Sequence, residues 1–113
     1  EAIGPYSQAI VHGGLLFTSG QIAINPASGQ VEADTIEGQT EQVMQNLAAL
    51  LEEAGASFDS VIKTTCFLSD MADFAAFNAI YDAYFVSKPA RSCVAVKELP
   101  LGGLVEIEVL AVV

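Results

Sequence analysis

The order of hydrophobic patterns along the chain constrains its fold more than any other feature. Residues 7–12 and 15–22 are short β-compatible runs, and the two glycines between them predict a hairpin. From residue 35 the apolar residues recur at steps of three and four, which predicts a helix over 35–54. Asp34 can cap its start, and Gly55 stands where a glycine typically ends a helix. The chain therefore begins with two strands and a helix.

A further strand and a second helix follow. Residues 61–68 are rich in β-branched side chains and predict a strand, after which Asp70 or Asp73 can cap a helix. The apolar stripe of this helix is aromatic and consists of Phe74, Phe77, Tyr81, Tyr84 and Phe85. Such a stripe favours core packing over a cofactor site. A proline stops the helix, and two more strands are predicted over 91–97 and 104–113.

The resulting order is two strands, a helix, a strand, a helix and two strands. Without strict alternation of strands and helices, this order predicts an α+β fold with one mixed sheet and both helices on one face. Residues 24–31 hold turn dipeptides and predict a loop with short strand pieces at its ends. The chain has 113 residues and no linker-like stretch, so we predict a single domain over 1–113.

Alternation along the strands predicts which side chains share a face. In the strand over 91–97, one face carries Arg91, Cys93, Ala95 and Lys97, and the other carries Ser92, Val94 and Val96. We expect the valines to face the helices. In the last strand Glu106 and Glu108 lie opposite the apolar residues. The prediction is that Arg91, Cys93 and a glutamate meet on the helix-free face.

The composition indicates a subunit interface. Hydrophobic residues make up 52% of the chain and charged residues only 16%. The apolar runs are too short for a membrane span. The alternative is a compact monomer with an apolar surface, but large exposed apolar patches are uncommon on monomers.

The charge and the cysteines limit the partners and the compartment. Fourteen acidic residues against four Lys and Arg give a formal net charge of −10, which argues against nucleic acid as a ligand. Cys66 and Cys93 form no disulfide framework, which suits a reducing, cytoplasmic compartment. We see no targeting signal and expect no membrane association.

The residues alone leave several roles open. Arg91 can be a salt-bridge partner or a functional cation. A cation near Cys93 favours a thiolate nucleophile, but His12 is the single histidine and lies far away in sequence, so a packing role is preferred. Tyr6 and Ser19 suit turn or capping roles. One histidine and scattered carboxylates give no zinc-ligand spacing, so no metal is expected.

Five ordered segments carry a family resemblance. They are IGPYSQAI (3–10), FTSGQI (17–22), VIKTTCFLSDMADFAAFNAIYDAYF (61–85), KPARSCVAV (88–96) and VEIEVLAV (105–112). Together they resemble the RidA (YjgF) family of reactive intermediate deaminases over nearly the whole chain. The resemblance implies a chorismate-mutase-like α+β fold and a homotrimer, a barrel with three clefts between subunits.

The resemblance also implies an activity and a site. The family hydrolyses enamines and imines such as 2-aminoacrylate and 2-iminopropionate to 2-oxo acids and ammonia, without a cofactor. By motif, Arg91 corresponds to the carboxylate-binding arginine and Glu106 to the acid that positions water. Tyr6, Ser19 and Cys93 correspond to positions that line the cleft. The implied partners are a small 2-imino or 2-enamino acid and further copies of the chain.

Two departures from the family pattern and one alternative function remain. The segment between Phe85 and Pro89 is short for the family, and the strand that usually precedes IGPY is missing. Both affect the rim of the expected cleft. The alternative function is a regulatory trimer that binds small carboxylates without catalysis. A ribonuclease role fits poorly with the net charge.

Overall fold

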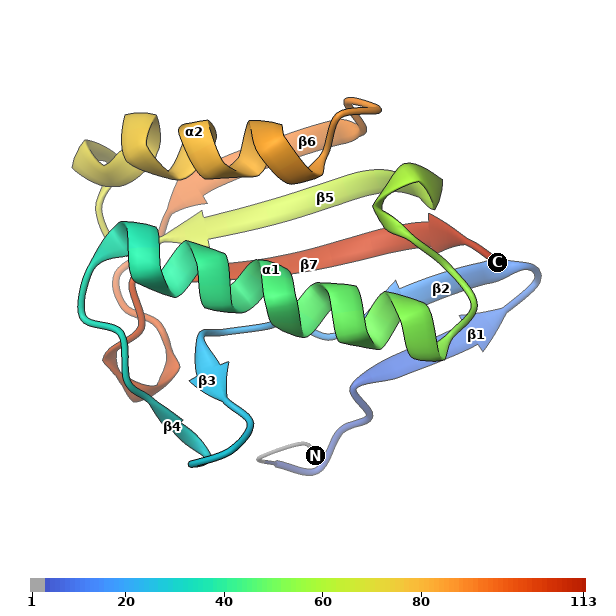
Figure 1. Cartoon of the computed structure of the whole chain (residues 1–113), viewed down its shortest axis with the longest axis horizontal. Coiled ribbons are helices and arrows are strands. Elements are labelled where there is room, and N and C mark those ends of the chain that lie inside the picture. Colours follow the sequence, from blue (N-terminus) through green and yellow to red (C-terminus); the bar gives the residue numbers. More distant parts are fainter. Residues whose placement is uncertain (1–3) are drawn as a thin grey trace.

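The computed structural model describes residues 4–113 and shows one five-stranded sheet with two helices on one face (Figure 1). Ile3, the first residue of the IGPYSQAI segment, lies outside the described residues, as do Glu1 and Ala2. The strand order is β1-β2-β7-β5-β6. The predicted α+β architecture, with its order of elements, is confirmed.

The sheet is mixed because one of its strand pairs is parallel. Its strands are β1 (Ala9–His12), β2 (Leu15–Thr18), β5 (Val61–Leu68), β6 (Ala90–Ala95) and β7 (Val105–Val112). Strands β5 and β6 run parallel and the other neighbours are antiparallel. The predicted loop with strand ends is a small second sheet of β3 (Ile24–Asn25) and β4 (Gln30–Val31).

Helix α1 (Ile36–Glu53) begins one residue later than the sequence indicated. Its cap is Thr35, whose hydroxyl accepts a hydrogen bond of 3.0 Å from the N–H of Gly38, and not Asp34. Gly55 has a φ of 79°, as a glycine that ends a helix should. The buried face of α1 includes Val43, Met44, Leu47 and Leu51 and lies on the sheet.

Helix α2 (Phe74–Tyr84) connects β5 to β6 and lies beside α1 on the same face (Figure 1). A short 3-10 turn, Met71–Asp73, precedes it, and Asp70 caps this turn by accepting from the N–H of Ala72. The aromatic stripe packs as predicted, since Phe77, Tyr81 and Phe85 are buried.

Strand β7 has the predicted alternation. Its side chains at positions 105, 107, 109 and 111 are buried beneath the helices, and Glu106 and Glu108 lie on the opposite face. The strand occupies the middle of the sheet, between β2 and β5.

The predicted faces of β6 are wrong. Arg91 is in register with Thr64 and Cys93 with Cys66, and both β5 partners are fully buried beneath α2. Paired residues of neighbouring strands share a face, so Arg91 and Cys93 point to the helices. Val94 is instead 48% exposed on the helix-free face. Alternation within one strand separates two faces, but the neighbouring strand decides which of them is covered.

The helix-free face carries several exposed apolar side chains as well as Glu106 and Glu108. Its exposed large side chains include Ile10, Phe17, Val94 and Val112, each 45–54% exposed. Among residues 4–113, no helix is long and apolar enough to cross a membrane.

Candidate functional site

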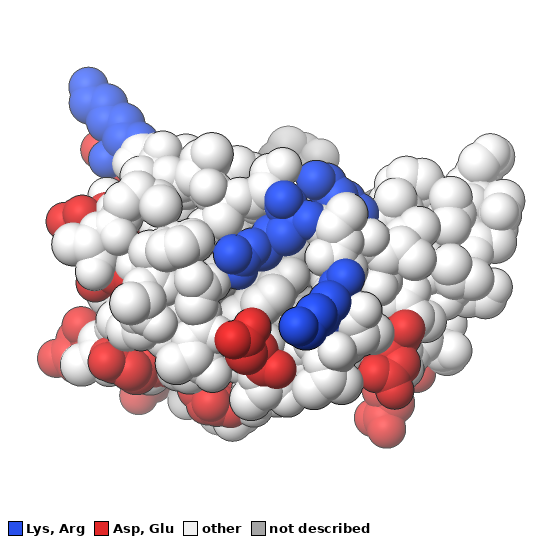
Figure 2. Space-filling view, turned by 90° about the horizontal axis from the view of Figure 1, so that it is seen from above, with Lys and Arg blue, Asp and Glu red and all other residues white. Residues whose placement is uncertain are grey.

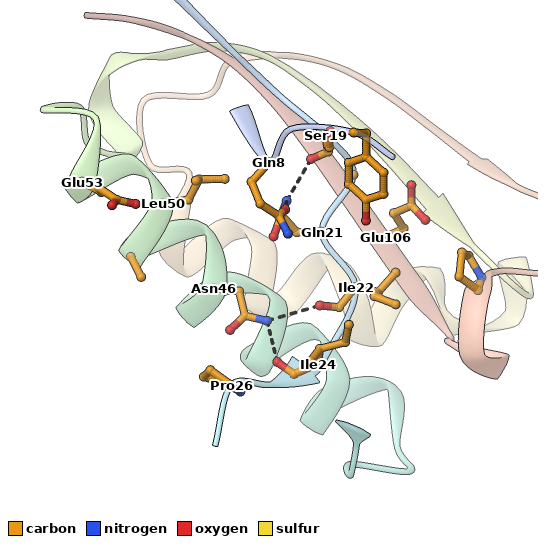
Figure 3. Close-up of a pocket in the computed structure, with 14 residues that line it drawn as sticks. Gln8, Ser19, Gln21, Ile22, Ile24, Pro26, Asn46, Leu50, Glu53 and Glu106 are labelled. Carbon is orange, nitrogen blue, oxygen red and sulfur yellow. Dashed lines mark hydrogen bonds between the residues drawn. The ribbon is translucent and has the colours of Figure 1, made fainter. Parts of the chain in front are cut away.

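One cavity in the described part of the chain, which we call the Glu106 cavity, has a volume of about 630 Å³. The loop after β2 and the segment before β1 form one wall, with Tyr6, Ser19 and Glu106 among the lining residues. Helix α1 forms the other wall (Figure 3). Three of the residues that the family resemblance indicated therefore lie around one opening.

The carboxylate of Glu106 rests against Gly20. A Cβ atom at Gly20 would overlap the carboxyl group of Glu106, so only glycine leaves room for the present position of this side chain. Gln21, the next residue, pairs with Ile107 through backbone hydrogen bonds of 2.8 and 3.0 Å. The loop is thereby held against β7 at the point where Glu106 projects.

Burial raises the pKa of Glu106, and the neighbouring charge of Glu108 raises it further. Both glutamates project from the same face of β7. A carboxyl group with a raised pKa exchanges protons closer to neutral pH than an ordinary glutamate, as general acids and bases do. Glu106 is therefore suited to proton transfer.

Amide and hydroxyl groups fix the rest of the wall. The side-chain amide of Gln21 donates to Gln8 Oε1 (3.0 Å) and to the carbonyl of Ser19 (3.1 Å). The Ser19 hydroxyl donates to the carbonyl of Ser7 at 2.6 Å and so links the loop after β2 to the segment before β1. These bonds hold the cavity wall in place.

Helix α1 is tied to the same loop. Asn46 donates hydrogen bonds to the carbonyls of Ile22 (3.2 Å) and Ile24 (2.9 Å), as Figure 3 shows. Leu50 and Glu53 project from the following turns of the helix into the opening. The cavity thus extends along α1, where an apolar and an acidic side chain line it.

A second cavity of about 310 Å³, the Arg91 cavity, lies beside α2. Arg91 Nη1 donates to Asn78 Oδ1 at 2.7 Å, and the guanidinium lies 4.7 Å from the ring centre of Tyr81 and 5.5 Å from that of Phe74. These contacts are with neutral groups. The charge of Arg91 is thus held by cation–π contacts and remains available to an anion.

Cys93 lines neither cavity. It packs against the hydrophobic core two residues after Arg91. Burial raises the pKa of its thiol, and the opposing effect of Arg91 is smaller. The thiol is therefore protonated at neutral pH, which supports a packing role over that of a nucleophile.

Within one chain, Arg91 and Glu106 do not meet. Arg91 projects from the helix-covered face at the edge strand β6, and Glu106 from the helix-free face of the central strand β7. The sequence reasoning also missed Gly20 and Asn78. The spacing of Phe74, Asn78 and Tyr81 is helical and could have revealed Asn78 as the polar member of the aromatic stripe.

Comparisons with known proteins identify the family of this chain. A family model described as Endoribonuclease L-PSP matches residues 1–113. Reactive Intermediate Deaminase A from Arabidopsis thaliana is 46% identical over 111 residues, which are 97% of this chain and 59% of the relative. The chain belongs to the RidA (YjgF) family. Its fold is the chorismate-mutase-like fold of that family.

Two further members show the range of the RidA family. AldR from Lactococcus lactis, whose name carries a proposed regulatory role, is 56% identical over 111 residues, 97% of this chain and 88% of the relative. The crystal structure of E. coli TdcF with bound serine matches with a TM-score of 0.92 at 40% identity and covers 99% of this chain and 91% of TdcF.

Proposed function

We propose that this member of the RidA family hydrolyses 2-imino acids and their enamine tautomers, such as 2-aminoacrylate and 2-iminopropionate, to 2-oxo acids and ammonia. The observation that carries the proposal is the glutamate with a raised pKa, resting on Gly20 in a cavity that Tyr6 and Ser19 also line. The Arabidopsis relative named as a reactive intermediate deaminase supports the same chemistry.

The reaction needs one water and two proton transfers. The oxygen of water attacks the imine carbon while the imine nitrogen takes up a proton, which gives a tetrahedral carbinolamine. The nitrogen of the carbinolamine then takes up a second proton and its hydroxyl group loses one, so that the C–N bond breaks, ammonia leaves and the carbonyl of the 2-oxo acid forms. Glu106 orients the water and transfers protons, and the planar guanidinium of Arg91 binds the substrate carboxylate through two parallel hydrogen bonds. The scheme uses no cofactor and no metal.

We further propose that the complete site forms between subunits of a homotrimer. The two residues lie on opposite faces of the sheet within one chain, so a second chain must bring its Arg91 to the Glu106 cavity. The exposed apolar side chains of the helix-free face supply a surface for such an assembly.

Turnover by the wild-type protein tests the activity. 2-Aminoacrylate is generated from serine with a dehydratase, and the release of pyruvate is followed with and without the protein. We expect clear acceleration, and its absence would remove the deaminase proposal. Light scattering coupled to size exclusion is expected to give three times the monomer mass. A monomer at micromolar concentration would contradict a site between subunits.

Mixed assemblies test where the two residues come from. Arg91→Ala and Glu106→Gln are each expected to be nearly inactive alone. If one chain supplies Arg91 and its neighbour Glu106, random co-assembly in equal amounts restores about a quarter of the wild-type activity, because half of the chains retain each residue. Mixtures as inactive as the single variants would show that both residues act from the same chain.

A regulatory function is the second candidate, favoured by the name of AldR. A wild-type protein that binds 2-oxo acids but accelerates no imine hydrolysis would support it. The net charge of −10 disfavours a ribonuclease, because RNA carries the same sign of charge.

A further inference from the structure

Lys88 brings a second cation to the Arg91 cavity and does so in a strained conformation. Its φ is 57°, in the left-handed region that costs a non-glycine residue about 1–2 kcal/mol. The N–H of Lys88 donates to the carbonyl of Phe85 at 3.1 Å, and Pro89 follows directly. A glycine would adopt this turn without strain. A lysine at such a position suggests a use for its side chain.

Cations are concentrated at this end of the molecule. The chain has four Lys and Arg, of which Lys88 and Arg91 line the same cavity. A third, Lys63, lies on the opposite, helix-free face of the sheet, where its Nζ donates to Ser92 Oγ at 3.1 Å, so it does not line the cavity. Figure 2, which looks onto the side of α2 and β6, shows basic side chains gathered near the middle of this face and another that projects at the upper left, while most acidic side chains lie around the edges.

The cavity can hold more negative charge than one carboxylate supplies. Its lining contains two cations against one acid, the exposed side chain of Asp82. The guanidinium of Arg91 contacts neutral groups and has a geometry that matches one carboxylate. Lys88 carries a compact ammonium on a flexible stem, which suits a second anionic group at a less fixed position.

We propose that Lys88 and Arg91 form a paired-cation subsite, and that this protein prefers 2-imino dicarboxylic acids to 2-imino acids with a neutral side chain. Arg91 holds the carboxylate next to the imine carbon, and Lys88 holds the carboxylate at the end of the side chain. The inference rests on the proposed function, because the subsite selects among substrates of the same reaction. An enzyme that oxidises acidic amino acids is the class of catalyst that would supply such imines.

A matched pair of substrates isolates the second charge. Imines are generated in situ by amino-acid oxidases from aspartate and from asparagine, whose side chains have similar size but differ in charge. We expect kcat/KM for the aspartate-derived imine to be about tenfold higher, the effect of one charge-assisted contact. In Lys88→Met this ratio should fall close to one, and in Lys88→Arg it should be largely kept. Asp82→Asn should raise the ratio, because it removes the negative charge from the lining of the cavity.

Two further variants separate the charge from the strain. Lys97→Met removes an exposed cation beyond the other end of β6 and should leave the ratio as in wild type. Lys88→Gly should raise the unfolding temperature by a few degrees, because the strain is relieved, while it lowers the ratio as Lys88→Met does. An unchanged ratio in Lys88→Met, or an equal loss in Lys97→Met, would overturn the proposal.

Binding distinguishes the failure of the subsite from the failure of the proposed function. Titration calorimetry with succinate and with butyrate needs no turnover. We expect tighter binding of succinate to wild type and loss of this difference in Lys88→Met. If the protein hydrolyses both imines without preference and binds succinate and butyrate equally, the subsite proposal is wrong and the deaminase proposal is unaffected. If wild type binds succinate more tightly than butyrate but hydrolyses neither imine, the deaminase proposal is wrong and the subsite proposal is supported.

Discussion

The Glu106 cavity lies between loop segments and helix α1, whereas the Arg91 cavity rests on one face of α2. In the first, a partly buried carboxyl group with a raised pKa lies against a glycine. In the second, a guanidinium lies on aromatic rings. One cavity is suited to proton transfer and the other to anion binding. The comparison suggests that chemistry and recognition are assigned to separate parts of the chain.

The largest loss is expected when the acid–base group is removed. Glu106→Gln keeps the shape of the side chain but removes its exchangeable proton. We expect kcat to fall by roughly 10²–10⁴-fold with a much smaller change in KM, because general acid–base catalysis contributes about that factor. Steady-state kinetics on 2-aminoacrylate give both constants. An unchanged kcat would show that another group transfers the protons.

Removal of the anion-binding group should cost somewhat less and act through binding. Loss of a hydrogen-bonded charge partner costs roughly 2–5 kcal/mol, so Arg91→Ala should lower kcat/KM by at least about thirtyfold. Arg91→Lys should fail nearly as badly, since lysine lacks the two-pronged geometry. Circular dichroism and light scattering should show the same fold and assembly. Full activity in Arg91→Lys would show that charge alone suffices.

Gly20→Ala should disturb the Glu106 cavity without touching the Arg91 cavity. The new methyl group displaces the Glu106 carboxyl, and a misplaced catalytic group can cost up to about 10²-fold, so we expect a loss of about tenfold or more. Gly13→Ala is the control. Its Cβ meets nothing within 4 Å, so the change strains the hairpin turn but not the site. Equal effects of both variants on activity would contradict the positioning role.

Glu108→Gln should shift the pH profile. The charge of Glu108 raises the pKa of Glu106, so the variant without that charge should have a Glu106 with a lower pKa. The part of the pH–rate profile that depends on Glu106 ionisation should therefore move to lower pH. A raised folded-state pKa also makes stability fall as pH rises through it, and this fall should become smaller in the variant. Rate profiles and thermal melts across pH measure both effects. A shift of this part of the profile to higher pH would contradict the role of Glu106 in proton transfer.

Cys93→Ala should have the smallest effect. The thiol is protonated and lines neither cavity, so activity is expected to stay within about threefold of wild type, with a modest loss of stability from the missing core contact. A loss of several hundredfold with fold and assembly unchanged would instead indicate covalent catalysis.

Local signals predicted most of the fold. The Gly13-Gly14 turn and the periodicity of α1 are set by neighbouring residues, so the sequence shows them directly. The predicted cap of α1 was wrong by one residue. Asp34 and Thr35 are both good capping residues, and the backbone conformation decides which of them caps the helix.

Non-local contacts explain what the sequence did not show. The face of Arg91 depends on its pairing with Thr64 in β5, and the contact between Gly20 and Glu106 joins residues from opposite ends of the chain. The alternation of side chains within a single strand predicts neither the pairing of Arg91 nor the contact of Gly20. Motifs indicated the candidate site residues. Only the fold shows that Tyr6, Ser19 and Glu106 line one cavity, that Arg91 lines another and that Cys93 lines neither.

The central position of β7 also has a consequence for biosynthesis. The hairpin of β1 and β2 is made first, yet its hydrogen-bonded neighbour in the sheet is β7, near the other end of the sequence. While a ribosome is still producing α2 and β6, the hairpin has no strand to join, and its apolar side chains must remain exposed or be shielded by chaperones. Folding of this sheet should therefore be largely post-translational, completed only when Val105–Val112 has emerged.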